Sequence, residues 1–204
     1  MTEATPITDN PTDGAKDPPK SVQFKDGPVL GYLSTWHKAL DSTGSDKAEG
    51  MHLANRGDRA RLRRCRSIDD VLLTPSYYAL REGLKSKGFD AQQHKDGDRR
   101  LATVVGLLSH IKENQTGADF AEQLATRRKD SQDAKLSGLR FRRLLTIDDR
   151  DKLFEKMIGV IRLLDGTLNV QDFAKDLYYW RPDSQCWVKK SWAQAYYSRL
   201  PDEP

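Results

Sequence analysis

The stretch "RRLATVVGLLSHIKEN", residues 99–114, shows most directly how this chain folds. Leu101, Val104, Val105 and Leu108 recur at spacings of three and four residues, which places them on one face of a helix. Such an apolar stripe has to be covered by other elements, because leaving it in water costs free energy. The stretch therefore predicts an amphipathic helix whose apolar side faces a hydrophobic core.

The same helical spacing recurs in other parts of the chain. After Pro28 it is carried by Val29, Leu33, Trp36 and Leu40. A further helix is expected from Asp148 to Leu164, ended by Gly166. We find no alternating strand pattern and no Asn-Gly hairpin signal. The chain is therefore predicted to be all-α, with two small helical bundles joined by a short connector near residues 130–137.

Capping residues predict where several helices begin. The expected N-terminal caps are Asp58, Ser67 with Asp70 three residues later, Thr116 with Asp119, and Asn169. The helix after Asp119 is expected to end in the basic residues 127–129. The last helix is expected to cover about residues 187–198.

The N-terminal segment, residues 1–26, has a different composition from the rest. It is rich in Pro, Thr, Asp and Gly, and its five acids outnumber its three bases. Such a segment cannot bury enough apolar surface to offset the entropy lost on ordering. It is therefore predicted to be a disordered tail, followed by an N-terminal helical domain at 27–132 and a C-terminal helical domain at 133–204.

Whole-chain properties restrict the class of protein. The 204 residues carry 34 bases and 30 acids, so the net charge is only +4. No run approaches the ~18 apolar residues of a membrane span, and the N-terminus lacks the apolar stretch of a signal peptide. Cys65 and Cys186 have no nearby partner cysteine and are expected to be small buried residues. These features predict a cytoplasmic protein without a membrane partner.

The basic residues are concentrated in two islands. The segment "NRGDRARLRRCRS", residues 55–67, holds six arginines and one acid, and on a helical wheel Arg59, Arg63 and Arg66 form one row. Residues 127–143 hold seven bases and two acids. Two such islands in a nearly balanced chain predict one basic face, which is typical of a nucleic-acid-binding protein. A solvated surface and a binding face for an acidic protein are the alternatives.

The sequence offers little that could support catalysis. The four histidines lie in separate segments, and no zinc-protease, zinc-deaminase or P-loop motif occurs. Asp148, Asp149 and Asp151 could hold a divalent metal, but their place at a helix start favours capping. We therefore expect no enzymatic activity, no metal and no cofactor.

Four segments, taken in order, resemble a known family. They are "RGDRARLRRC" at 56–65, "VLLTPSYYAL" at 71–80, the run from "GLRFRRLL" to "DLYYW" at 138–180, and "WVKKSWAQAYY" at 187–197. Together they resemble CasB, the small subunit of type I-E Cascade, which is the RNA-guided surveillance complex of CRISPR immunity. The resemblance covers roughly residues 28–198.

This resemblance implies a non-catalytic, all-helical subunit, present as two copies stacked head to tail in the complex. The implied partners are the CRISPR RNA, the target and displaced DNA strands of the R-loop, other Cascade subunits and a second copy of the chain. Carried over by position, the family's basic residues fall on Arg63 and Arg64, on Arg142 and Arg143 with Arg140 beside them, and on Arg162. With the two islands, the predicted nucleic-acid-binding set is Arg59, Arg63, Arg64, Arg66, Arg127, Arg128, Arg140, Arg142, Arg143 and Arg162.

Two other functions remain open at this point. A helix-turn-helix regulator of duplex DNA would need a recognition helix, for which "NVQDFAKDLYYW", residues 169–180, is the best candidate. A helical adaptor would use its basic patch to bind an acidic protein.

Overall fold

The structure is a computed structural model that describes residues 22–43, 47–48, 51–52, 54–128 and 133–200. Residues 1–21 of the predicted disordered tail lie outside the described residues. Residues 22–26 are part of the folded structure, because Phe24 is fully buried and stacks on Tyr178 with 4.0 Å between the ring centroids. The prediction therefore set the end of the tail a few residues too late.

The prediction of an all-α fold is confirmed. The α-helices are α1 (Gly27–Ala39), α2 (Arg56–Leu62), α3 (Ile68–Leu72), α4 (Pro75–Ser86), α5 (Gly97–Leu108), α6 (Phe120–Ala125), α7 (Gly138–Leu145), α8 (Arg150–Leu163), α9 (Val170–Tyr179) and α10 (Trp187–Arg199). A short 3-10 helix, η1, covers Ala91–Gln93. The strands have two residues each: β1 (Lys47–Ala48) pairs antiparallel with β2 (Met51–His52), and β3 (Glu113–Asn114) pairs parallel with β4 (Thr167–Leu168).

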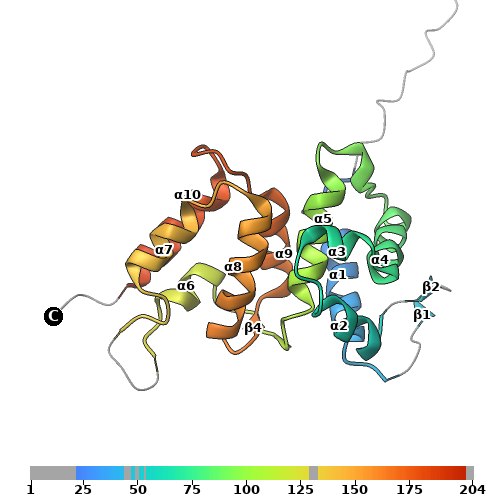
Figure 1. Cartoon of the computed structure of the whole chain (residues 1–204), viewed down its shortest axis with the longest axis horizontal. Coiled ribbons are helices and arrows are strands. Elements are labelled where there is room, and N and C mark those ends of the chain that lie inside the picture. Colours follow the sequence, from blue (N-terminus) through green and yellow to red (C-terminus); the bar gives the residue numbers. More distant parts are fainter. Residues whose placement is uncertain (1–21, 44–46, 49–50, 53, 129–132, 201–204) are drawn as a thin grey trace, which may run out of the picture.

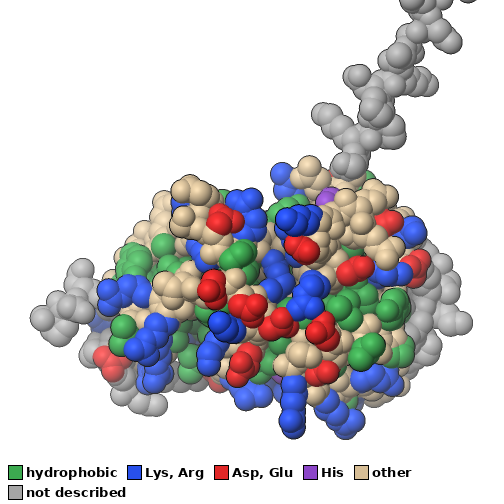
Figure 2. All heavy atoms as spheres, turned by 45° about the horizontal axis from the view of Figure 1, so that its top comes forward, with side chains coloured by type: hydrophobic (Ala, Val, Ile, Leu, Met, Phe, Trp, Pro, Cys, Tyr) green, Lys and Arg blue, Asp and Glu red, His purple; other side chains and the backbone are tan. Residues whose placement is uncertain are grey.

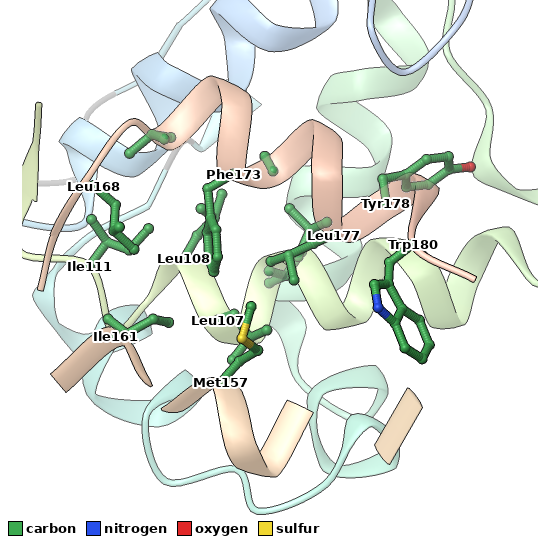
Figure 3. Close-up of a cluster of buried hydrophobic side chains, with 14 of the residues drawn as sticks. Leu107, Leu108, Ile111, Met157, Ile161, Leu168, Phe173, Leu177, Tyr178 and Trp180 are labelled. Carbon is green, nitrogen blue, oxygen red and sulfur yellow. The ribbon is translucent and has the colours of Figure 1, made fainter. Parts of the chain in front are cut away.

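Helix α5 lies at the centre of the fold. Its predicted apolar stripe is confirmed, but burial extends all round the helix, since every residue from 101 to 111 is buried. Helices α3, α4, α8 and α9 all pack on it. In Figure 3, Leu107 and Leu108 lie in the same buried cluster as Met157 and Leu177. A Cβ added at Gly106 would lie 2.5 Å from the ring of Phe154 on α8. The absence of a side chain at residue 106 therefore lets α8 approach α5 closely.

The helices are arranged as two groups that share one core. In Figure 1, α1–α5 lie at one end of the molecule and α6, α7 and α10 at the other, with α8 and α9 between them. Helix α9 packs on both α1 and α5, while α6 packs on α10. The buried apolar residues of both groups form one continuous cluster. The division into domains at 27–132 and 133–204 stays a prediction.

Two of the four predicted N-terminal caps are confirmed. Ser67 and Asp70 form a capping box, and the Asn169 side chain accepts hydrogen bonds from the first turn of α9. Asp119 precedes α6 but makes no side-chain cap, and α6 ends at Ala125 instead of continuing through residues 127–129. The predicted burial of both cysteines is confirmed. Within the described ranges, no helix is long and apolar enough to cross a membrane.

A largely buried carboxylate on α9 makes the stability of the fold depend on pH. Burial raises the pKa of Asp176 to about 6, although the Trp192 indole donates a 2.7 Å hydrogen bond to its carboxylate. The unfolded chain releases this proton near pH 4 and the folded chain near pH 6. The folded state therefore binds more protons in this window, and stability falls as the pH rises from about 4 to about 6.

We predict that Asp176→Asn stabilises the protein at neutral pH. The amide oxygen still accepts the indole hydrogen bond, but no charge has to be buried, so the expected gain at pH 7.5 is about 1–2 kcal/mol. Below pH 4 the gain should vanish, because Asp176 is then neutral in both states. Urea unfolding at pH 3.5, 5 and 7.5 measures this difference. A gain that is the same at all three pH values would contradict the assignment.

Candidate nucleic-acid interface

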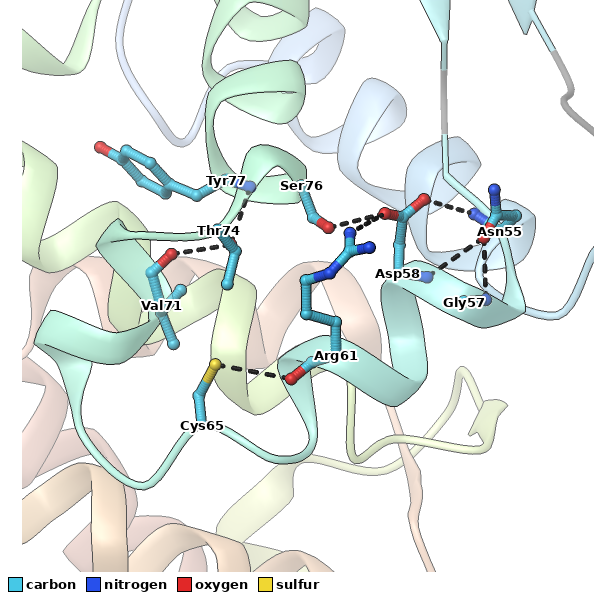
Figure 4. Close-up of polar contacts among 9 residues, drawn as sticks. All are labelled: Asn55, Gly57, Asp58, Arg61, Cys65, Val71, Thr74, Ser76 and Tyr77. Carbon is cyan, nitrogen blue, oxygen red and sulfur yellow. Dashed lines mark hydrogen bonds and ion pairs between the residues drawn. The ribbon is translucent and has the colours of Figure 1, made fainter.

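The first arginine island begins on a short helix with a well-formed N-terminus. The Asn55 side chain accepts hydrogen bonds from the backbone N–H groups of Gly57 and Asp58 at 2.8 and 3.1 Å. Asp58 in turn accepts a bond from the Asn55 N–H at 3.1 Å, which completes a capping box (Figure 4). The prediction that Asp58 is the N-cap is therefore wrong: Asn55 is the cap, and Asp58 lies in the first turn.

Helix α2 ends at Leu62, so the arginine island does not lie on one continuous helix as expected. The next backbone bonds run from Arg64 to Arg61 and from Cys65 to Leu62, a tighter three-residue pattern that turns the chain out of the helix. Arg63 is the C-cap, and Arg66 lies beyond the helix. The predicted row of Arg59, Arg63 and Arg66 on one helix face is therefore wrong, because the three residues do not share a helix.

The first half of the island is bound within the protein. The Arg59 guanidinium is only 9% exposed and donates to the Ser109 and Ile111 carbonyl oxygens and to the Asp41 carboxylate. Arg61 pairs with Asp58 at 3.2 Å, a carboxylate that also accepts a bond from the Ser76 hydroxyl (Figure 4). These contacts neutralise part of the island. They also bury Arg59, a predicted nucleic-acid ligand, and direct Nε, Nη1 and Nη2 of its guanidinium to acceptors within the protein.

The second half of the island is exposed. Arg63, Arg64 and Arg66 face solvent, and the side chains of Arg63 and Arg64 have no hydrogen bond or ion pair with any described residue. Arg66 lies close enough to Asp70 to help lower the pKa of that carboxyl, although the backbone N–H groups of Arg66 and Ser67 lower it more. Arg63 and Arg64 therefore have guanidinium groups available for an external anion.

His110 lies within reach of the charges of both Arg63 and Arg162. This histidine is buried at the C-terminal end of α5, and its Nε2 has no hydrogen-bond partner among the described residues. Its pKa is lowered to about 4, chiefly by burial and in addition by the positive charges of Arg63, Arg162 and Arg59. Both charges act on one imidazole, so the end of α8 and the turn that follows α2 both lie within electrostatic range of His110.

The second island divides between a loop and α7. Arg127 and Arg128 are exposed beyond the end of α6. The backbone of Arg127 pairs with that of Ala134 in an isolated antiparallel β-bridge, and the Arg128 side chain donates to the Lys135 carbonyl oxygen. On α7, Phe141 and Leu144 are buried. The remaining faces of α7 carry Arg140, Arg142 and Arg143, which are exposed and whose side chains bind no described residue.

Helix α8 lies between the two sets of exposed arginines. Its exposed residues include Lys156, Gly159 and Arg162, which follow one another along the same side of the helix. Together with α7 it forms a groove of about 490 Å³, which we call the α7/α8 groove. The groove is lined by Leu136, Arg140, Arg143, Leu144, Ile147, Lys156, Gly159, Val160 and Leu163.

The face drawn in Figure 2 carries both acidic and basic side chains. Figure 2 shows acidic side chains in a band across the middle of one face, while Lys and Arg side chains gather along its lower edge and toward the end that holds α7. Arg99, for example, pairs with both Asp69 and Asp151 at 2.6 Å. On this face the asymmetry of charge is therefore local, with basic side chains gathered at one edge and one end.

The acids at the start of α8 have structural roles. Asp149 caps the helix by accepting a 2.9 Å bond from the Lys152 N–H, as the capping interpretation predicted, and Asp151 binds Arg99. Among the described residues, no three His, Cys, Asp or Glu side chains are placed to hold a metal ion.

Comparison with known proteins identifies one family. The model of a family described as CRISPR-associated protein Cse2 matches residues 58–197, which is most of the chain. No curated protein and no solved structure matches the chain. The matched range includes every predicted nucleic-acid residue, from Arg59 to Arg162.

Proposed function

The chain belongs to the Cse2 family of CRISPR-associated proteins, the CasB small subunit of type I-E Cascade, and from this premise we propose that it holds nucleic-acid backbones in that complex without cutting them. The proposed ligands are the CRISPR RNA and the target and displaced DNA strands. The proposed protein partners are other Cascade subunits and a second copy of the chain. Bases are read by pairing with the guide, so this subunit needs only charge and shape.

The observation that carries the proposal is a set of exposed arginines without partners in the described protein. The set is Arg63, Arg64, Arg140, Arg142, Arg143 and Arg162. Like charges held close together destabilise a fold unless a counter-charge neutralises them. A sugar-phosphate chain supplies that counter-charge, and its binding releases condensed cations. Arg59 is left out of the proposed interface, because its guanidinium is buried against carbonyl oxygens.

The regulator alternative receives no support from the candidate recognition helix. Helix α9 has no exposed residue from Val170 to Tyr179, and it packs on α1 and α5. A recognition helix must place its side chains in a major groove, which a covered helix cannot do. The adaptor alternative is distinguished from nucleic-acid binding by the purification experiment described next.

We expect the tagged full-length chain, purified from its host at physiological salt, to carry RNA of one uniform length. The guide RNA of a surveillance complex has a defined length, whereas RNA bound only by charge would be heterogeneous. Denaturing electrophoresis of the extracted RNA makes the measurement, and an untagged lysate passed over the same resin is the control. An acidic protein recovered without nucleic acid would favour the adaptor. A DNA site bound at least ~10³-fold tighter than random DNA would favour the regulator.

A further inference from the structure

The α7/α8 groove combines an apolar floor with a basic rim. We propose that it receives an unstacked base of a single-stranded nucleic acid, whose adjoining phosphates are held by Arg140, Arg143 and Lys156. The inference rests on the proposed function and deepens it, because it specifies single strands and names a site for one base. Single strands are commonly bound by a charged track for the backbone together with an apolar surface for the bases.

Aliphatic side chains make the floor of the groove, which is only partly open to solvent. It is formed by Leu144, Ile147, Val160 and Leu163. Leu163 is 39% exposed although it lies beside buried residues of α8. Exposed apolar surface of this kind costs free energy in water, and the flat face of a nucleobase is a ligand that covers it. Arginine planes at the rim can stack on the same base.

Gly159 is the residue that opens the floor. It lies in the middle of α8, and a Cβ added there would meet no atom within 4 Å. Gly106 on α5 is different, because a Cβ there would lie 2.5 Å from the ring of Phe154. Glycine inside a helix costs roughly 0.5–1 kcal/mol relative to alanine. Packing within the chain does not require glycine at residue 159, whereas a side chain there would occupy the groove.

The rim of the groove has the charge that a phosphate needs. Arg140, Arg143 and Lys156 are exposed, their side chains bind no described residue, and no acid lies among the lining residues. A second cleft, lined by Arg99, Arg100, Arg150 and Arg181, lies at the start of α8. That cleft also contains Asp96, Asp148 and Asp149, so its positive charge is largely balanced. Of these two sites, the α7/α8 groove is the one suited to an anionic chain with an apolar base.

The test compares two fluorescent 20-mers at 50 mM salt: oligo-dT, and an abasic phosphodiester of the same length. The full-length wild-type chain should bind oligo-dT about 10-fold tighter than the abasic strand, within the range reported for stacking of one base. Gly159→Leu fills the groove and should abolish this preference while leaving affinity for the abasic strand unchanged. The matched control is Gly31→Leu on α1, where an added Cβ also meets no atom within 4 Å. This control should keep the 10-fold preference.

Each contrary outcome has its own meaning. Equal wild-type affinity for the two strands would overturn the base site and leave phosphate binding by the subunit intact. A preference that survives Gly159→Leu would also overturn it. If that variant kept the preference but no longer joined the complex purified from the host, the groove would be a docking site for a protein helix. Failure of the wild-type chain to bind either strand would count against the proposed function itself.

Discussion

Replacing Arg64 and Arg143 together with alanine is expected to weaken binding of a single-stranded 20-mer about 25-fold at 0.1 M salt. Each arginine comes from a different island, and neither side chain has a partner among the described residues. If each neutralises one phosphate, the log–log dependence of affinity on salt should lose about 0.7 per contact, or about 1.4 in total. If the two proteins bind equally at 1 M salt, a slope smaller by about 1.4 makes the affinity of the double variant about 25-fold weaker at 0.1 M salt. The loss should be the same for every base sequence.

The matched control removes two positive charges that are already paired. Arg61 lies 3.2 Å from Asp58, and Lys85 lies 3.7 Å from Asp90. The double variant Arg61→Ala with Lys85→Ala should leave the salt slope close to that of the wild-type chain. Fluorescence anisotropy from 50 to 300 mM salt measures all three proteins. Equal slopes for the three proteins would show that Arg64 and Arg143 do not contact phosphate.

Phe141→Ala is expected to cost about 3–5 kcal/mol of unfolding free energy. Phe141 is the fully buried aromatic residue of α7, and its ring stacks on Tyr196 of α10 with 3.9 Å between ring centroids and 9° between planes. Its removal leaves a cavity and breaks the stacked pair, which is worth about 0.5–1.5 kcal/mol on its own. In a chain of this size the melting temperature should fall by roughly 10 °C. Because Arg140, Arg142 and Arg143 lie on the same helix, their placement depends on this anchor.

Leu139→Ala provides the comparison on the same helix. Leu139 lies two residues away and is 54% exposed, so its truncation should change the unfolding free energy by no more than about 0.5 kcal/mol. Urea denaturation followed by circular dichroism measures both variants. A cost below about 1 kcal/mol for Phe141→Ala would mean that α10 does not hold α7 in place through this contact.

Much of the fold could be predicted from local patterns. The spacing of Leu101, Val104, Val105 and Leu108 identified α5, and Ser67 with Asp70 marked the start of α3, because both signals act within a few residues. The end of α2 could not be predicted in this way. Its arginine-rich sequence has good helical propensity throughout, but the chain turns at Arg63 and buries Cys65. Tertiary packing decides that boundary.

The candidate site was predicted less completely than the fold. A count of charges could not separate Arg59 from Arg63, because the carbonyl oxygens of Ser109 and Ile111 that bind Arg59 lie about fifty residues away in sequence. Lys156 and Gly159 were missed, although the apolar stripe of Leu153, Met157 and Val160 leaves both outside the buried face of α8. The exposure of these two residues indicates a binding groove only once α7 is known to lie beside α8. The joint effect of Arg162 and Arg63 on His110 likewise depends on the three-dimensional fold.

The continuous core that both helical groups share fixes the spacing between their exposed arginines. Arg63 follows α2 in one helical group and Arg143 belongs to α7 in the other, yet both groups rest on one continuous core. A flexible strand laid across this surface would have to take up the separation that the protein dictates. Longer or shorter steps between phosphates would leave one guanidinium unmatched. Rigid spacing of this kind would let a subunit with no means of reading bases still favour one strand geometry over another.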